Sequence, residues 1–285
     1  MAHELQNCRL KTWKREIIAA NCYAIPLYLA AMCLILFAFQ QHADYPLIVI
    51  ANRDEYYARP TQNAHWWNDA DIFAGRDLEA NGTWLGINHQ GHFAAVTNVR
   101  EPGGMKAGKI SRGELTRNYL STTQTAETYL QQLTPHDQDY AGFNLLLGDR
   151  QGLWFYSNRD HGIRHIEAGI YGISNGGFDE PWPKLSSGKL ELEAMLSSEI
   201  DAGELMEILT DHRIAHDHEL PDTGVPLDIE RMLSSRFIRS PGYGTRACSV
   251  VTIDASNQVR FSEQNFTDAE HPGVLIQETF DITPA

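Results

Sequence analysis

The chain has 285 residues, of which 42% are hydrophobic and 10% aromatic, enough to bury a sizeable core in one large domain or two small ones. Its 23 basic and 37 acidic residues give a formal net charge of −14, and no Lys/Arg cluster offsets that negative field. Because nucleic-acid binders neutralise phosphates with clustered cations, DNA and RNA are excluded as expected partners. The cysteines, at positions 8, 22, 33 and 248, lack the paired spacing of a zinc site or a disulfide framework, which predicts no metal and a reducing, cytoplasmic location.

Residues 1–31 are expected to form an extension that precedes a single domain at 32–285. An uncharged stretch at 17–39 follows several basic residues and is long enough to cross a bilayer, but its second half reads as a strand and it lacks a signal-cleavage pattern. Three interpretations stay open: a translation start at Met32, a removed pro-segment, and a membrane anchor. A membrane partner is therefore expected only if the extension is retained.

Two apolar runs, at 32–39 and at the start of 46–55, predict a buried β-hairpin. Cys33 stands at the start of the first strand, and the tetrapeptide Asn-Arg-Asp-Glu at 52–55 ends the second. These two ends meet in an antiparallel hairpin, which brings a thiol beside an arginine and two carboxylates. Strand alternation lets only two of the four polar side chains face the same side.

The rest of the domain is expected to group its strands and helices without strict βαβ alternation, which indicates an α+β fold. Ser111 and Glu114 form a predicted capping box at the start of a helix. Residues 65–67 and 71–75 are expected to be irregular or edge segments. Strands are predicted at about 83–88, 92–98, 143–147, 153–157, 163–167, 169–174, 244–254 and 258–261, and helices at 111–120, 125–133, 183–197 and 201–212.

The tetrapeptide at 52–55 is the signature of the NRDE family, also called the transport and Golgi organisation protein 2 family. The Met-Cys start of the first strand resembles the start of family members, and 243–250 resembles the family's last block. The blocks at 86–98 and 171–176 are similar to hairpins of cysteine-type N-terminal-nucleophile (Ntn) hydrolases. Over residues 32–285, this resemblance implies a four-layer αββα sandwich of the Ntn-hydrolase type.

The resemblance implies an amidase or acyltransferase whose nucleophile is an amino-terminal Cys33. The α-amino group of such a cysteine, with an ordinary pKa of about 7.7 to 8.0, can take the thiol proton, provided that Met32 is removed. Arg53 is the expected cation beside the thiolate, and Asp54 or Glu55 the acceptor for the amine. Choloylglycine hydrolases have Arg-Asn-any-Asp instead, so the first two residues are swapped here and the catalytic role of the arginine is open.

Asn98 and Asn175 each follow an apolar strand, where their amides are candidates for donors to a developing oxyanion. A second cation is expected from Arg246 or Arg236, with Arg246 preferred because its block is the family's own. The structural alternatives are a buried strand cysteine, an ion-pair cluster at the end of a strand and asparagines that serve only in turns.

A second function class is a non-catalytic binding or trafficking protein. The NRDE family is associated with Golgi organisation, lipid homeostasis and haem mobilisation in eukaryotes, so the resemblance implies haem or a lipid or acyl ligand; the hydrolase itself requires no cofactor. Trp66, Trp67 and Trp84 predict an apolar pocket near Cys33 for an acyl chain or a flat ligand. The expected partner is thus a small-molecule amide, acyl compound or haem, and the oligomeric state is left open.

Overall fold

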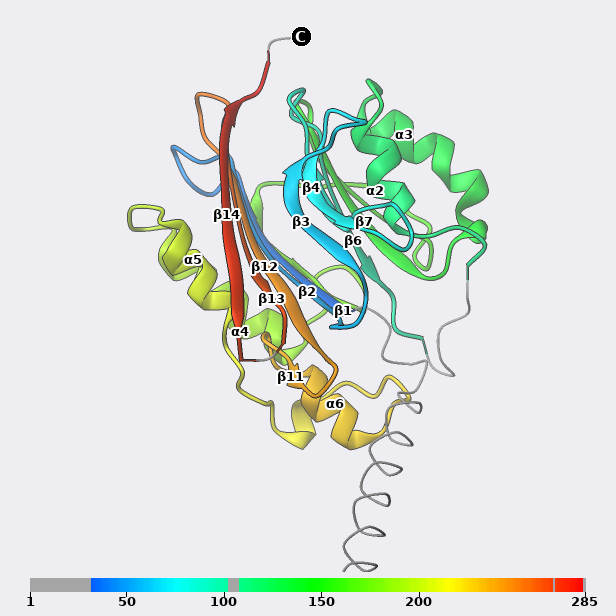
Figure 1. The fold of residues 1–285 in the computed structure, drawn as a ribbon, viewed down its shortest axis with the longest axis vertical. Coiled ribbons are helices and arrows are strands. Elements are labelled where there is room, and N and C mark those ends of the chain that lie inside the picture. Colours follow the sequence, from blue (N-terminus) through cyan, green and yellow to red (C-terminus); the bar gives the residue numbers. More distant parts are fainter. Residues whose placement is uncertain (1–31, 102–107, 269, 284–285) are drawn as a thin grey trace, which may run out of the picture.

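The computed structural model describes residues 32–101, 108–268 and 270–283 (Figure 1). The expected extension at 1–31 lies outside them, so the domain boundary at Met32 stays a prediction. The described residues form two seven-stranded antiparallel sheets that pack face to face, and helices cover both outer faces. This arrangement confirms the predicted four-layer αββα sandwich.

The predicted hairpin lies inside the first sheet. Strand β1 (Met32–Phe39) pairs with β2 (Leu47–Tyr56), which sets Cys33 opposite Arg53. Every residue of β1 is buried, because one face meets the second sheet and the other meets helices. The sheet order is β10 (Gly169–Ile173), β1, β2, β12 (Tyr243–Ile253), β13 (Gln258–Phe266) and β14 (Pro272–Asp281), with β11 (Arg239–Ser240) paired to β12.

The second sheet contains two strands that the sequence did not predict as regular elements. Residues 65–66 belong to the edge strand β3 and 73–75 to β4. A register shift between Gln62 and His65 interrupts the alternation of β3, which hides the strand from a period-two pattern. The sheet order is β3 (Thr61–Trp66), β4 (Phe73–Asp77), β5 (Leu85–Ile87), β6 (Phe93–Asn98), β7 (Phe143–Asp149), β8 (Gly152–Ser157) and β9 (Arg164–His165).

The helices within 113–133 form one outer layer, on the right of Figure 1, and those within 183–209 form the other, on the left; the helix at 227–233 lies at the lower end of the view. On one side Tyr119 and Leu130 are buried against the second sheet; on the other Leu185 and Leu205 are buried against the first. None of the described helices has the length and apolarity needed to cross a membrane. The helices are α2 (Gly113–Leu120), α3 (Ala126–Leu133), α4 (Pro183–Met195), α5 (Ala202–Leu209) and α6 (Leu227–Leu233), with 3₁₀ turns η1 (Thr134–Asp139) and η2 (Asp217–Glu219).

Two of the predicted helices begin with side-chain caps in the structure. Thr125 accepts from the backbone of α3, and Asp201 accepts from two backbone N–H groups of α5. The prediction of a capping box at Ser111 is wrong. Helix α2 begins at Gly113, and its N-cap residue, Arg112, makes no side-chain cap. Ser111 Oγ accepts from Gly113 N at 3.3 Å. The segment before α2 is thereby left to line a cavity.

Side-chain alternation in β1 and β2 decides which residues reach that cavity. Odd-numbered positions such as Ile35 and Val49 enter the core between the two sheets. Even-numbered positions such as Leu34 and Ile50 pack beneath α4 and α5. The polar residues at the end of either strand follow the same alternation: odd-numbered ones face the space between the sheets, and even-numbered ones face the helices.

Candidate functional site

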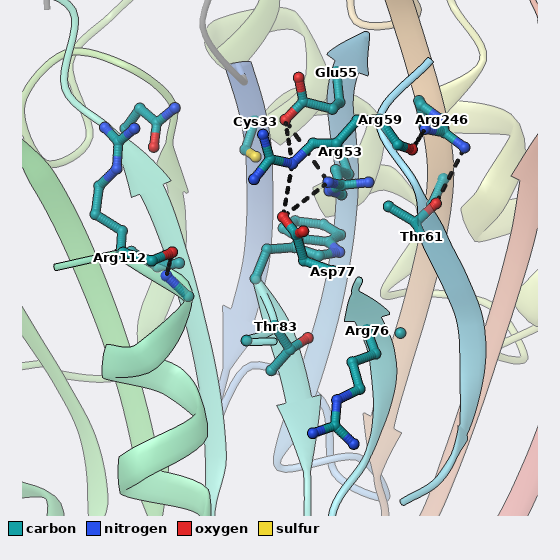
Figure 2. A pocket seen from close by; sticks show the side chains of 18 of the residues that line it. Cys33, Arg53, Glu55, Arg59, Thr61, Arg76, Asp77, Thr83, Arg112 and Arg246 are labelled. Atoms are coloured by element: carbon teal, nitrogen blue, oxygen red, sulfur yellow. Dashed lines mark hydrogen bonds and ion pairs between the residues drawn. The ribbon is translucent and has the colours of Figure 1, made fainter. Parts of the chain in front are cut away.

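A cavity of about 640 Å³ lies between the sheets at the end where Cys33 begins β1 (Figure 2). Its walls come from β1, β2, β4, β6, β12 and β13, together with the segment that leads into α2. A volume of this size is typical of sites for small molecules. The cavity is therefore the candidate functional site.

Strand alternation divides the signature tetrapeptide between the two faces of the sheet. Arg53 and Glu55 point into the cavity. Asn52 turns to the helical side, where its amide donates to two backbone carbonyls at 2.8 and 2.9 Å. Asp54 faces the same way and accepts from Thr245 Oγ1 at 2.6 Å. Of the four residues of the tetrapeptide, Arg53 and Glu55 are therefore the two that can contact a ligand in the cavity.

Cys33 lines the cavity and is only 4% exposed. Burial raises the pKa of this thiol to about 12; the charges of Asp54 and Glu55 add to the rise and Arg53 opposes it. Arg53 lies opposite Cys33 in the β1–β2 ladder, so its charge acts on the thiol from the neighbouring strand. Because the thiolate is the nucleophile, this thiol is unreactive at neutral pH in the continuous chain.

Met32, the residue before Cys33, is buried as the first residue of β1. Its side chain is buried against Leu233, Ile238 and Tyr243, and its backbone nitrogen donates to the Tyr243 hydroxyl at 3.1 Å. The nitrogen of Cys33 is thus held in an amide bond within a packed strand. Cleavage of that bond would free an amine beside the cavity and remove a buried side chain.

Arg53 forms ion pairs with two carboxylates at distances too long for hydrogen bonds. Its Nη2 lies 3.7 Å from Glu55 Oε2 and 3.9 Å from Asp77 Oδ2. Asp77 binds Arg59 Nε more closely, at 2.7 Å, and Arg59 Nε lies 3.7 Å from Glu55 Oε2. The expected ion-pair cluster is therefore present, and within it Arg53 has only the more distant contacts.

Arg246 reaches the cavity from a bulge in β12. The pairing with β2 shifts between Thr245 and Ala247, so Arg246 is an extra residue in the ladder. Its guanidinium donates to two backbone carbonyls, at 2.6 and 3.1 Å, and to Thr61 Oγ1 at 3.1 Å. Arg236, the alternative, pairs with Glu191 and does not line the cavity.

The two asparagines take different positions. Asn98 ends β6 and lines the cavity. Asn175 follows β10, is fully buried, and donates its side-chain amide to the Asn98 backbone carbonyl at 2.9 Å. Its role as an oxyanion donor stays a prediction, and its geometry is that of a residue that holds Asn98 in place.

Of the three tryptophans expected at an apolar pocket, one lines the cavity. Trp84 lines it, but Trp66 enters the core between the sheets and Trp67 packs under α2, since neighbouring residues point to opposite faces. Charged side chains stand beside the apolar lining: Arg53, Arg59, Arg76, Lys109, Arg112 and Arg246, with Glu55, Asp77 and Glu263.

Several of these charged residues were missed in the sequence. Glu263 is a buried acid in β13; burial raises its pKa, and it accepts from Ala64 N at 2.8 Å. A charge at an inward-facing strand position was the available signal. Burial also lowers the pKa of Arg112 to about 10, but its place before a predicted helix gave no signal.

We expect Glu55→Gln to speed alkylation of Cys33 at every pH below the thiol pKa. The Glu55 carboxylate raises that pKa, so removing its charge lowers the pKa and increases the thiolate fraction. An increase of about 2- to 10-fold, for a shift of up to about one unit, is expected from iodoacetamide rates across pH 7 to 9. Glu79→Gln, which removes an exposed carboxylate near Arg59, is the control. Equal rates in all three proteins would make Glu55 purely structural.

Comparison with known proteins agrees with the residues that suggested a family. The Transport and Golgi organisation 2 family model matches residues 32–268. The human Transport and Golgi organization protein 2 homolog is 34% identical over 266 residues, covering 84% of this chain and 95% of its own length. The Drosophila melanogaster Transport and Golgi organization protein 2 is 30% identical, covering 85% and 95%.

Two solved structures are more distantly similar, each with a TM-score of 0.41. One is an N-acylethanolamine-hydrolyzing acid amidase ortholog of Caenorhabditis elegans, 12% identical, with coverage of 71% of this chain and 98% of that one. The other is a mutant conjugated bile acid hydrolase of Clostridium perfringens, 10% identical, with coverage of 88% and 97%. Neither likeness assigns an activity. The family match and the identity to the animal proteins do establish kinship: the chain belongs to the Transport and Golgi organisation 2 family.

Proposed function

We propose that the protein is an Ntn-type hydrolase of carbon–nitrogen amide bonds that uses Cys33 as nucleophile once its amino group is free. One observation carries the proposal: Cys33 lines the large cavity, and the peptide bond to Met32 is what keeps its nitrogen from being a free amine. The reaction is assigned to the cytoplasm, where reducing conditions keep both described cysteines as free thiols.

The freed amine of Cys33 takes the thiol proton, with Arg53 favouring the thiolate. The sulfur attacks the carbonyl carbon of the substrate amide, a C–S bond forms, and the carbonyl electron pair moves to oxygen. The side-chain amide of Asn98 donates to this oxyanion, held in position by Asn175. When the carbonyl re-forms, the C–N bond breaks and the Cys33 ammonium gives its proton to the leaving amine.

The thioester that remains is resolved by water. The Cys33 amine accepts a proton from the attacking water, the C–S bond breaks, and the acid leaves as the thiol is restored. An amine that enters in place of water would give acyl transfer by the same steps. Cys33 thus supplies both the nucleophile and the base.

The alternative of a haem or acyl carrier has less support from the residues in hand. No His or Met stands among the described residues that line the cavity, and a thiol with a pKa of about 12 is protonated. The remaining candidate for an axial ligand to haem iron is Tyr56, and burial and the charge of Glu55 raise its pKa, which favours the protonated phenol. The charged lining does not suit a bare acyl chain. A carrier is therefore retained only as an outcome of the test below.

We expect a chain that begins at Cys33 to form a covalent acyl adduct at that residue when offered a panel of N-acyl amides and thioesters. Intact-mass and peptide-mass measurements locate the adduct. Cys33→Ala removes the nucleophile and should lower turnover by about 10⁴-fold or more. Cys248→Ala, which changes the other described free cysteine, is the matched control and should keep the adduct. Ligand binding that survives Cys33→Ala, with no amide cleaved by the unmodified protein, would support the carrier and refute the hydrolase.

A further inference from the structure

We propose that the Cys33 cavity binds a substrate that carries an oxyanion, a carboxylate or a phosphate, and that Arg53 and Arg246 hold this group. The proposal rests on the proposed function for the place of the scissile amide, while binding of the anion itself requires no turnover. It names a substrate class that an apolar pocket would reject.

The lining of the cavity has a net positive charge, whereas the chain as a whole has a net negative charge. Six cationic and three acidic side chains line it, in a protein whose formal net charge is −14. Arg59, Arg76 and Lys109 each have a carboxylate oxygen within 2.8 Å. Among the described residues, Arg53 and Arg246 have none at hydrogen-bonding distance. Arg246 donates only to uncharged oxygens, so the positive charge of neither arginine is paired with a close carboxylate, and both charges can attract an anion.

Arg53 is the stronger observation, because the residue is only 9% exposed. A guanidinium carries five N–H donors, and buried donors without acceptors are costly. Within the part of the chain that the structure describes, its carboxylate neighbours lie at 3.7 and 3.9 Å, beyond hydrogen-bond length. Arg53 lines the cavity, and none of its nitrogen atoms is among the fully buried atoms without a partner, so its donors are within reach of an anion that enters the cavity.

Arg246 lies close enough to be affected by Arg53. Burial lowers the pKa of Arg246, and the charge of Arg53 lowers it further. Its Nε is buried without a partner among the described residues. Two guanidinium groups that face one space repel each other, and an anion between them replaces that repulsion with charge-assisted hydrogen bonds.

The remaining space fits the rest of such a molecule. Arg112 faces these two arginines from the opposite wall (Figure 2), and Trp84 and Val96 supply apolar lining. A carboxylate or phosphate matches the planar fork of a guanidinium, which can bind it through two parallel hydrogen bonds. The cavity thus combines an anion site with room for an acyl group beside the thiol.

The test is calorimetric binding to the full chain carrying Cys33→Ala, so that no probe reacts. The probes are two matched pairs, octanoate against octanamide and octyl phosphate against octanol. We expect at least one anion to bind about 10-fold or more tightly than its neutral counterpart, with binding that weakens as salt is raised. Preference in the first pair identifies a carboxylate, preference in the second a phosphate, and preference in both a general oxyanion site.

Further arginine variants in the Cys33→Ala chain locate the effect. Arg53→Gln and Arg246→Gln should each weaken anion binding about 10-fold while changing neutral binding less than about 2-fold, and Arg53→Lys should keep part of the preference. Arg213→Gln, at a largely exposed arginine outside the cavity, is the control. Equal binding of charged and neutral probes, or an equal loss in Arg213→Gln, overturns the proposal. Anion selectivity without any acyl adduct in the active chain would refute only the hydrolase.

Discussion

Replacing Lys184 with methionine should lower the free energy of unfolding by about 3 to 5 kcal/mol at pH 8 and by much less at pH 5. Both Lys184 and Asp54 are buried behind the cavity, on the helical side of the first sheet. Burial raises the pKa of Asp54 to about 7, and Lys184 is the largest attractive charge that opposes the rise. Removing Lys184 leaves a buried carboxylate without its main compensating charge.

The pH dependence follows from the direction of that shift. A carboxyl group whose pKa is higher in the folded protein than in the unfolded chain binds its proton more tightly when folded, so stability falls as the pH rises from about 4 towards 7. Without Lys184 the pKa of Asp54 rises further, and the fall continues above pH 7. At pH 5 the carboxyl is protonated in either protein, and the cost of losing Lys184 is small.

Urea denaturation at pH 5 and pH 8 measures the effect. Lys189→Met changes a more exposed lysine of the same helix, which pairs with Asp179 at 2.7 Å, and should cost less than about 1 kcal/mol at both pH values. Combining Lys184→Met with Asp54→Asn removes the buried charge and should abolish the extra loss at pH 8. The same loss at both pH values in Lys184→Met would mean that packing, and not charge, is what Lys184 provides.

Alkylation of Cys33 at pH 7.5 should be about 100-fold faster in a chain that begins at Cys33 than in the full chain. Burial raises the thiol pKa to about 12 while Met32 is attached. Freeing the amine places an ammonium beside the thiol and removes the buried Met32 side chain, which admits water. A fall of about two units in the thiol pKa accounts for the 100-fold increase, at tenfold per unit.

A chain that begins at Met32 and keeps that residue is the control, because it lacks the extension but retains the amide bond at Cys33. Its rate should match that of the full chain. Alkylation at Cys248, which is buried and belongs to the layer beneath α5, should stay slow in all three. If the chains beginning at Met32 and at Cys33 react equally fast, the amide bond to Met32 is not what silences the thiol.

The sequence was informative where the chemistry lies within one strand pair. The hairpin, the alternation that sends Arg53 and Glu55 to one side, and the end of β6 at Asn98 all follow from period-two patterns. Local patterns failed where irregularity intervenes: a bulge obscures β3, and the exposed apolar residues of β14, such as Val274, break its alternation.

The character of the cavity could not be predicted from local patterns at all. Arg59, Asp77 and Arg112 come from separate segments and meet only because two sheets pack against each other. Which cation pairs with which carboxylate depends on small differences in distance: Asp77 Oδ2 lies 2.7 Å from Arg59 Nε and 3.9 Å from Arg53 Nη2. Tryptophans close in sequence suggested an apolar lining, but a strand sends adjacent side chains apart.

The bulge in β12 adds the positive charge of Arg246 to the site without moving any residue of the hydrophobic core. Arg246 and Ala247 together face Arg53, and beyond them the pairing resumes with Cys248 and Val250 still on the helical side. A strand without the extra residue would keep its ladder and its core positions and would lose only the arginine. The register of the sheet and the charge of the cavity are therefore separable properties. Insertion or deletion of the bulge residue changes the charge of the cavity and leaves the strand pairing on either side as it is.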